Sequence, residues 1–458
     1  MEESLITKRY TKTIKLIEIL FLKLESGWYI ILFLLPFTAI KGDYFEQIRD
    51  FKYIFIAFLI SITLFVFIAS TRYTVPKSPV LLPFIAMVAV FLISSLNSVD
   101  YILAWKGIFF TLPLYFVGFV ILVPAVFNRT GQLSTGIKIV LISGLLSSLF
   151  AVAQSVGNFL GFSMLIRPIY QRNTGIFGSY PFPRAHALSM EPLNLSSFLL
   201  FILAISFSLW IAPEIPLKCS RRFVGLTALF SFLGIIAAAS RAGWLSLSLM
   251  GVSFALIFRR RLWLYKNRIA LLFLIVLLMV IFLIGTNVAG VWAFAKIEVG
   301  RFVSGANVAS SIDYEHRLKR LYNFLEVVFE YPFFGQGGLR NLGLIHYELI
   351  PGVNNAPRVT TSLNSYIDIA VEEGLLGLFA FAWLLGAYFV QVIKASRRAD
   401  YHWRFLLIGF IVGMLAYAFQ LNFFNGFEEQ HFWAFLGLGL ATSRVGLIEF
   451  RRSITNPP

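Results

Sequence analysis

The residues of this sequence best suited to chemistry are arginines. Arg317 and Arg320 are three residues apart in a stretch with helical periodicity, so they share one helix face. Arg241 lies between two apolar runs that are separated by almost no loop. Because the planar guanidinium group binds phosphate oxygens in pairs, these arginines indicate a phosphate or diphosphate ligand. A solvated helix face and a snorkelling arginine at a helix end are the alternatives.

A second polar stretch, residues 181–192, leads directly into an apolar run and carries Arg184 and Glu191. Glu191 is followed by proline, and both residue types are favoured at a helix start. The acid is therefore either a structural residue at a helix start, or a carboxylate that orients an arginine or acts as a base. These alternatives stay open at this point.

No metal centre or cofactor is expected. The single cysteine, Cys219, cannot form an intrachain disulfide or a cysteine cluster, and the five histidines lack paired metal-ligand spacing. A diphosphate leaving group needs its developing charge neutralised. Arginines without a metal site fit metal-independent transfer from a lipid diphosphate. The candidate ligands for the diphosphate and its glycan on the outer face are Arg172, Arg184, Arg241, Arg317, Arg320 and Arg340.

The elements that must position these side chains are transmembrane helices. Of 458 residues, 58% are hydrophobic and only 14% are charged, whereas a soluble protein has about 25% charged residues. A membrane-spanning helix needs about 20 mostly apolar residues. The sequence predicts an all-α polytopic membrane protein with about twelve spans, centred on 25–40, 52–70, 79–97, 108–127, 136–160, 194–213, 223–239, 241–258, 269–287, 374–393, 403–421 and 431–447.

The loop charges predict the orientation of these spans. With the N- and C-termini in the cytoplasm, most Lys and Arg residues, including Arg259–Arg261, fall on the inner side, and most Asp and Glu residues fall outside. No cleavage site follows the first apolar run, so we expect a retained helix rather than a signal peptide. The net charge of +16 therefore reflects orientation and attraction to anionic lipid, and no nucleic-acid partner is expected.

Two long outer loops are predicted, at about 161–193 and 288–373. They divide the chain into nine transmembrane helices (1–287), a large outer (periplasmic) loop with short amphipathic helices (288–373), and three last transmembrane helices (374–458). Within the large loop, residues 315–331 show helical periodicity that ends at a Pro- and Gly-rich segment. A second short helix is expected at about 361–372, before Gly374 opens the next span.

Three stretches resemble the O-antigen ligase / O-antigen polymerase superfamily of bacterial membrane glycosyltransferases (Wzy-like proteins). They are Ser240–Trp244, Arg317 to Gly337 in the large loop, and the block from Leu363 to Gly377, which is similar to the family's HN-x-Y-L…E-x-GLIG pattern. The resemblance implies a GT-C-type fold and an inverting glycosyltransferase without cofactor. Its substrates would be glycans linked to undecaprenyl diphosphate. It places the protein in the bacterial inner (plasma) membrane, with a chain-length regulator protein as a possible partner.

By the same resemblance, Arg241, Arg317 and Arg320 bind the diphosphate, and Asn364 and Tyr366 fall in the third motif as further substrate-binding candidates. The family's histidine before the asparagine is Leu363 here. This departure argues against a ligase acting on lipid A-core. The candidate bases that remain are Glu191, His316 and His346.

The function expected from the sequence is therefore that of an O-antigen or exopolysaccharide polymerase. It would join lipid-linked repeat units, as lipopolysaccharide and other polysaccharide biosynthesis requires. The first alternative is an O-antigen ligase transferring glycan to lipid A-core. A transporter or flippase is the second, although the long outer loop and the unlike halves of the chain disfavour a repeat-built transporter. The sugar, the linkage and the oligomeric state are not encoded in any recognisable motif.

Overall fold

The computed structural model of the chain describes residues 24–37, 46–69, 77–98, 105, 108, 112–159, 184–189, 191–264, 322, 324–337, 364–427 and 429–455. Within these ranges the regular structure is helical and no β-strand occurs. A first helix spans Leu24–Phe33. The following elements are α2 (Glu46–Ala69), α3 (Leu81–Ser94), η1 (Ser95–Asn97), α5 (Leu112–Tyr115), η3 (Phe116–Leu122), α6 (Val123–Val126), α7 (Thr130–Phe159), α8 (Pro192–Ile211), α9 (Arg221–Ala237), α10 (Arg241–Leu264), α15 (Ser365–Arg398), α16 (Tyr401–Gln420), η6 (Leu421–Phe423) and α17 (Gln430–Thr455).

Six of the described helices are long and apolar enough to cross a membrane. They are α7, α8, α10, α15, α16 and α17, and four shorter apolar helices lie nearer the N-terminus. The predicted all-α polytopic membrane protein is thereby confirmed. The number of twelve spans and the GT-C class stay predictions, and the expected span at 269–287 lies outside the described residues.

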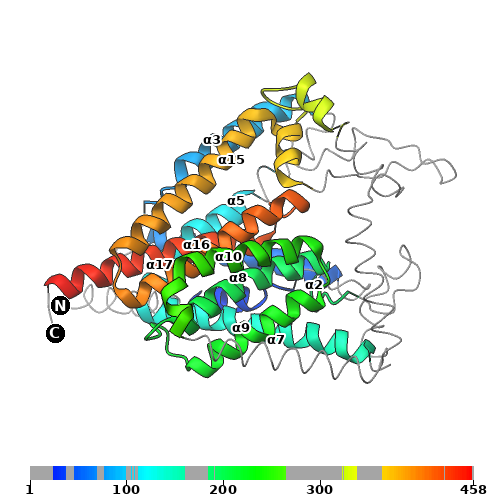
Figure 1. Ribbon diagram of the computed structural model, residues 1–458. Coiled ribbons are helices and arrows are strands. Elements are labelled where there is room, and N and C mark those ends of the chain that lie inside the picture. Colours follow the sequence, from blue (N-terminus) through cyan, green and yellow to red (C-terminus); the bar gives the residue numbers. More distant parts are fainter. Residues whose placement is uncertain are drawn as a thin grey trace, which may run out of the picture.

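Helix α8 lies at the centre of the bundle, in contact with α7, α9, α10, α16 and α17 (Figure 1). Nearly all of its residues are buried, as expected of a helix surrounded by other helices. Two glycines on α16 permit a close contact with α8. A Cβ atom at Gly409 would lie 2.9 Å from Cα of Ile205, and one at Gly413 would lie 3.0 Å from Cδ1 of Phe201. Such small residues let two membrane helices approach closely and gain van der Waals contact.

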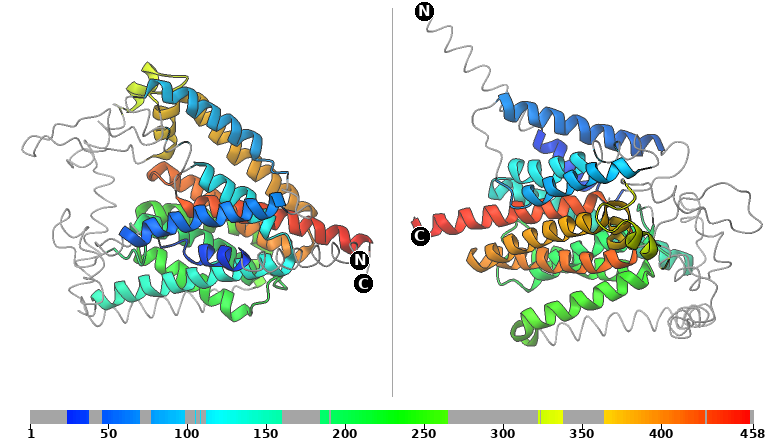
Figure 2. Two further views of the ribbon diagram at one scale, coloured as in Figure 1. Left: turned by 180° about the vertical axis from the view of Figure 1, so that it is seen from behind. Right: turned by 90° about the horizontal axis from the view of Figure 1, so that it is seen from above.

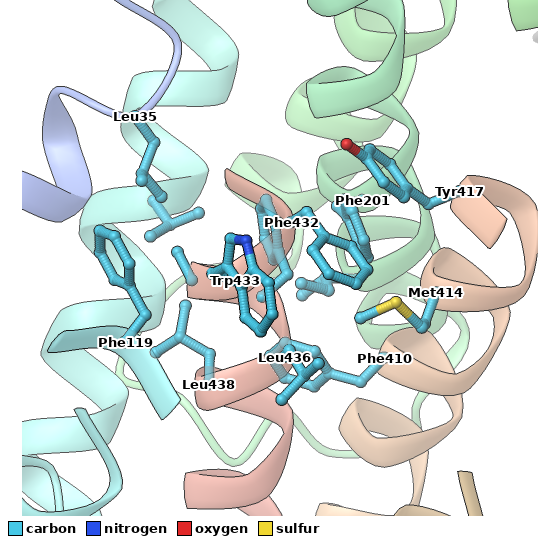
Figure 3. Close-up of a cluster of buried hydrophobic side chains, with 14 of the residues drawn as sticks. Leu35, Phe119, Phe201, Phe410, Met414, Tyr417, Phe432, Trp433, Leu436 and Leu438 are labelled. Atoms are coloured by element: carbon cyan, nitrogen blue, oxygen red, sulfur yellow. The ribbon is translucent and has the colours of Figure 1, made fainter. Parts of the chain in front are cut away.

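The side chains of α17 fill the space between two groups of helices. Figure 3 shows Trp433 and Leu438 on the side of Phe119, which belongs to the π-helix η3. Phe432 lies on the other side and stacks on Tyr417 of α16, with ring centroids 5.4 Å apart. Burial of these large aromatic rings contributes both apolar area and favourable ring geometry. The register of α17 is therefore fixed from two sides.

Helices α3 and α15 form a pair that lies at one edge of the bundle (Figure 1). Helix α15 is broken at Gly374, whose φ of 70° and ψ of −175° are not helical. The Tyr331–Gly337 segment, which follows a helix at 324–330, lies against this break (Figure 2). Its carbonyl at Pro332 accepts a hydrogen bond from the amide of Leu375 at 2.8 Å, and its amide at Gly337 donates to the carbonyl of Glu372 at 2.9 Å.

Glycine is required at both sides of this contact. A Cβ at Gly335 would lie 2.5 Å from the carbonyl oxygen of Glu372, and a Cβ at Gly374 would collide with the carbonyl of Phe333. The side chain of Asn97 at the end of η1 donates to the carbonyl of Gly335 at 3.1 Å. The Pro- and Gly-rich motif and the motif around Gly374 thus form one backbone junction, which satisfies the amides and carbonyls left open by the break in α15.

Candidate functional site

One end of the bundle, called the outer end below, gathers most of the buried polar side chains that join different helices. Helices α8, α10, α15 and α17 begin there, and α3, α9 and α16 end there (Figures 1 and 2). It is the end that the loop charges predict to face outward. Polar residues buried at the end of an otherwise apolar helix bundle are costly unless they are paired, so a functional role is the first interpretation.

The centre of this end is a hydrogen-bonded cluster of four side chains on α8 and the start of α17. Nδ2 of Asn194 donates to Oε1 of Glu429 at 2.7 Å. The other carboxylate oxygen of Glu429 lies 3.8 Å from Nδ1 of His431. Nε2 of His431 lies 2.9 Å from Oγ of Ser197. We call these residues, Asn194, Ser197, Glu429 and His431, the outer-end cluster.

The geometry assigns the proton on one histidine nitrogen. The hydroxyl of Ser197 donates to the carbonyl of Asn194 at 2.8 Å, so its oxygen accepts from Nε2–H of His431. A proton on Nδ1 as well would make an ion pair with Glu429. The His431 side chain is 1% exposed and that of Glu429 is 20% exposed. A substrate can therefore reach the carboxylate, while the imidazole acts behind it.

Arg241 is the first residue of α10 and is exposed at the same end. The preceding residue, Ser240, caps the helix, because its hydroxyl accepts from the amide of Gly243 at 3.2 Å. Gly243 lies against α8, where a Cβ would be 2.9 Å from Oγ of Ser196. The guanidinium group thus lies at a helix N-terminus, whose open amides and dipole favour anions.

Arg184 is held beside the same turn of chain. Its Nε donates to the carbonyl of Ala238 at 3.3 Å, and the amide of Ala185 donates to the carbonyl of Ala237 at 3.1 Å. Arg184 thus contacts the short α9–α10 connection, and Arg241 directly follows this connection at the start of α10. Two of the arginines predicted from the sequence therefore lie at the same end of the bundle.

His186 follows Arg184 in a tight turn. Its Nδ1 lies 3.0 Å from the carbonyl of Ser189, and its amide and that of Ala187 both donate to Oε1 of Gln154 on α7. Burial lowers the pKa of His186 to about 4, the hydrogen bond to Ser189 opposes this, and the nearby charge of Arg184 adds to the lowering. The imidazole is therefore neutral at pH 7.

Glu191 occupies the N-cap position of α8, and its exposed side chain makes no capping hydrogen bond. Pro192 follows at the first helical position, as expected for a helix start. Asn194 lies one turn further along α8, so Glu191 and the outer-end cluster are neighbours on this helix. The carboxylate is available to solvent at the rim of the cluster.

The two candidates from the third motif hold the start of α15. The side chain of Asn364 accepts from the amides of Tyr366 at 3.0 Å and Ile367 at 3.3 Å, so it is the N-cap. The hydroxyl of Tyr366 donates to the carbonyl of Ala418 at 2.7 Å. Both side chains thereby have a structural function at the outer end.

Six of the predicted site residues lie outside the described residues: Arg172, His316, Arg317, Arg320, Arg340 and His346. Conversely, sequence reasoning did not select Asn194, Glu429 and His431. Their only signal is a set of polar residues at the ends of apolar runs. Pairing of residues more than 230 positions apart, as between Asn194 and Glu429, is decided by packing.

Comparison with protein families supplies an independent result. Residues 226–382 match the family described as O-antigen ligase. This part of the chain is thus similar to the O-antigen ligase family. The matched range includes Arg241, Asn364, Tyr366 and both sides of the junction at Gly374, and it confirms the resemblance drawn from the motifs. Together with the apolar helices, it identifies a multi-pass membrane protein. No curated protein matches the chain in a sequence comparison.

The match to the O-antigen ligase family does not extend over the whole outer end. Arg184, Glu191, Asn194, Glu429 and His431 lie before or after the matched range. The matched range supplies Arg241 and, at the start of α15, the buried carboxyl groups of Asp368 and Glu373. The carboxylates of Glu191 and Glu429, which are not buried, lie outside it.

Proposed function

We propose that this protein transfers a glycan from undecaprenyl diphosphate to a hydroxyl group of a second glycan at the outer end of the bundle. The observation that carries the proposal is that Arg184, Arg241, Glu191 and Glu429 all lie at this one end of the bundle. Guanidinium groups can bind the negatively charged diphosphate, and a carboxylate can accept the proton of the acceptor hydroxyl. The family match supports glycan transfer in a membrane protein.

In the proposed reaction, the arginines stabilise the leaving diphosphate and a carboxylate accepts the proton of the acceptor. The oxygen of the acceptor hydroxyl forms a bond to the anomeric carbon, and the bond from that carbon to the diphosphate oxygen breaks. The electron pair of the broken bond leaves with the diphosphate, whose added negative charge the arginines stabilise. The hydroxyl proton passes to a carboxylate. Attack from the side opposite the leaving group inverts the anomeric carbon, and no metal is required.

Arg241 is the residue that we assign to the diphosphate. It is exposed and lies at the capped N-terminus of α10. The guanidinium group and the helix dipole therefore both attract an anion. Arg184 is half-buried and already bonded to a backbone carbonyl through Nε. It supplies positive charge from the adjacent segment.

Glu429 is the carboxylate that we assign as general base. It is partly exposed, and its two oxygens are directed by Asn194 and His431. A base oriented by a second, buried group is the arrangement that acid–base catalysis requires. Glu191 has the more exposed carboxylate and no such partner on its capping position, so it is the second candidate. His316 and His346 lie outside the described residues and stay predictions from the sequence.

The acceptor in this proposal is a lipid-linked repeat unit, which makes the protein a polymerase. Leu363 replaces the histidine of the ligase motif, and the first-loop pattern of Arg184 with Glu191-Pro192 fits the polymerase branch. A ligase that transfers to lipid A-core is the alternative. The proposed location is the inner membrane with both termini in the cytoplasm, and a chain-length regulator is a proposed partner.

The test uses the purified full-length protein, undecaprenyl-diphosphate-linked repeat units and a chelator of divalent metals. A ladder of lengthening glycans on a gel is expected, and Arg241→Ala should abolish it. Transfer only after addition of lipid A-core would identify a ligase. The absence of both products with a verified cognate substrate would exclude glycan transfer and favour transport.

A further inference from the structure

A cavity of about 720 Å³ lies at the opposite, inner end of the bundle, between the segment before α3, the η3–α6 helices, α15 and α17. Arg444 on its wall follows His431 by 13 positions on α17, which is about 20 Å along a helix. The C-terminal part of α17 extends past the other helices at this end (Figure 2). The cavity is therefore separate from the outer-end cluster.

Among the described residues, three basic side chains and no acidic one line this cavity. Lys77 and Arg451 are exposed and Arg444 is half-buried. The two arginines are seven positions apart, so they lie on one face of α17 two turns from each other. Lys77 faces them from the segment before α3. Three positive charges around one hollow favour an anionic ligand.

Two polar atoms of the lining residues lack protein partners. Nη1 of Arg444 and Oγ of Ser78 are buried, and neither has a hydrogen-bond partner among the described residues. A buried donor without a partner costs free energy that a bound acceptor would recover. The cavity therefore needs a ligand with several acceptor oxygens as well as negative charge, which describes a phosphate group.

Apart from Gln391 of α15, the rest of the described wall is apolar. Val120 and Pro124 from η3 and α6 face Leu440 and Leu447 from α17. A small soluble anion would leave this apolar surface uncovered, whereas an acyl chain would bury it. The combination of cations and an apolar wall at the end of a membrane helix bundle matches the headgroup region of a bilayer.

A second cavity with basic side chains lies at the inner end, but its arginine already has protein partners. This cavity is smaller, about 310 Å³, and is lined by Arg261. The guanidinium group donates to the carbonyl of Ile211 at 3.2 Å and lies over the rings of Tyr401 and Phe405. No atom of its lining residues is a buried polar atom without a partner among the described residues. The larger cavity is thus the one that calls for a ligand.

We propose that the cavity formed by Lys77, Ser78, Arg444 and Arg451 binds the phosphate of an anionic phospholipid of the inner leaflet, with an acyl chain along Val120 and Leu447. Such a lipid joins α17 to the segment before α3 and to α15. It stabilises the inner end of the bundle without taking part in glycan transfer.

Lipid binding to the delipidated, detergent-solubilised full-length protein tests the proposal. Native mass spectrometry would follow titration with phosphatidylglycerol and, separately, phosphatidylcholine. We expect one tight site for phosphatidylglycerol that phosphatidylcholine does not fill. Arg444→Gln should weaken it about tenfold, because one charge-assisted contact is lost. Arg398→Gln is the matched control. Arg398 is exposed at the inner end of the bundle, where α15 ends, but does not line the cavity. This substitution should leave the affinity for phosphatidylglycerol unchanged.

Two further variants allow for a folding defect in Arg444→Gln. Lys77→Gln and Arg451→Gln alter exposed side chains at the cavity rim, and each should weaken phosphatidylglycerol binding severalfold. Equal binding to all variants, or equal binding of the two lipids, would overturn the proposal. Displacement of phosphatidylglycerol by glycerol 3-phosphate at comparable concentration would also overturn it, because the ligand would then be a soluble phosphate compound.

Discussion

Asn194 on α8 donates a hydrogen bond of 2.7 Å to the carboxylate of Glu429, which lies one residue before α17. This bond fixes the carboxylate at the outer end of the bundle, next to the buried His431. It is the contact on which the proposed assignment of the base depends.

Replacement of Glu429 by glutamine should lower the rate of glycan transfer about a hundredfold or more, since an amide cannot accept the acceptor's proton. The amide oxygen still accepts from Asn194, so the fold should persist. The rate of polymer formation in the purified protein measures the effect. Glu214→Gln, at an exposed residue paired with His402 at 3.5 Å, should be without effect.

Glu191→Gln is the companion measurement. If this variant loses activity while Glu429→Gln keeps it, the base is Glu191 and the assignment to Glu429 is wrong.

Arg241→Lys should retain some activity, whereas Arg241→Ala should retain very little, because lysine keeps the charge but not the bidentate contact. We expect a loss of about tenfold for lysine and more than a hundredfold for alanine in kcat/KM for the lipid-linked donor. Arg222→Ala, at an exposed position near the start of α9, is the control and should behave as wild type. Equal activity of all three variants would contradict a diphosphate site at Arg241.

Gly374→Ala should destabilise the protein by about 1–3 kcal/mol, because an L side chain is strained at its φ of 70° and the new Cβ would collide with Phe333. Thermal unfolding in detergent measures the change as a lower Tm. Gly386→Ala on the same helix is the control, since nothing lies within 4 Å of a Cβ there, and alanine should be neutral or stabilising. Equal Tm values for the two variants would argue against the junction at the break in α15.

Acidification should destabilise the segment that carries Arg184. The pKa of His186 is lowered from its ordinary value of 6.5 to about 4, so between these values the unfolded state binds a proton that the folded state does not. Stability is therefore complete above about pH 6.5 and falls as the pH drops toward 4, by at most about 2 kcal/mol between pH 7 and 5. His186→Gln should show a smaller decrease of Tm over this range than wild type. An identical pH dependence in both proteins would refute this role of the imidazole.

Sequence alone determined the class of the protein and the ends of its helices. Apolar runs of about 20 residues leave the chain no alternative to membrane helices, because backbone groups in lipid must be paired internally. The same local reasoning predicted a helix start after Glu191 and a helix boundary at Gly374, and the motif resemblance agrees with the matched family. These features depend on neighbouring residues only. The binding of an anion by Arg241 stays a prediction.

Tertiary structure decided which of these ends meet. The sequence does not indicate that Asn194 bonds Glu429. Nor does it indicate that Gly335 lies against the backbone of Glu372 and Gly374 against that of Phe333. Asn364, selected as a substrate-binding candidate, also caps α15, and Tyr366, selected for the same reason, anchors α15 to α16. Contacts of this kind arise from the packing of helices that are distant in the chain. Hydropathy does not predict them, because it indicates that a helix face is buried but not which helix it packs against.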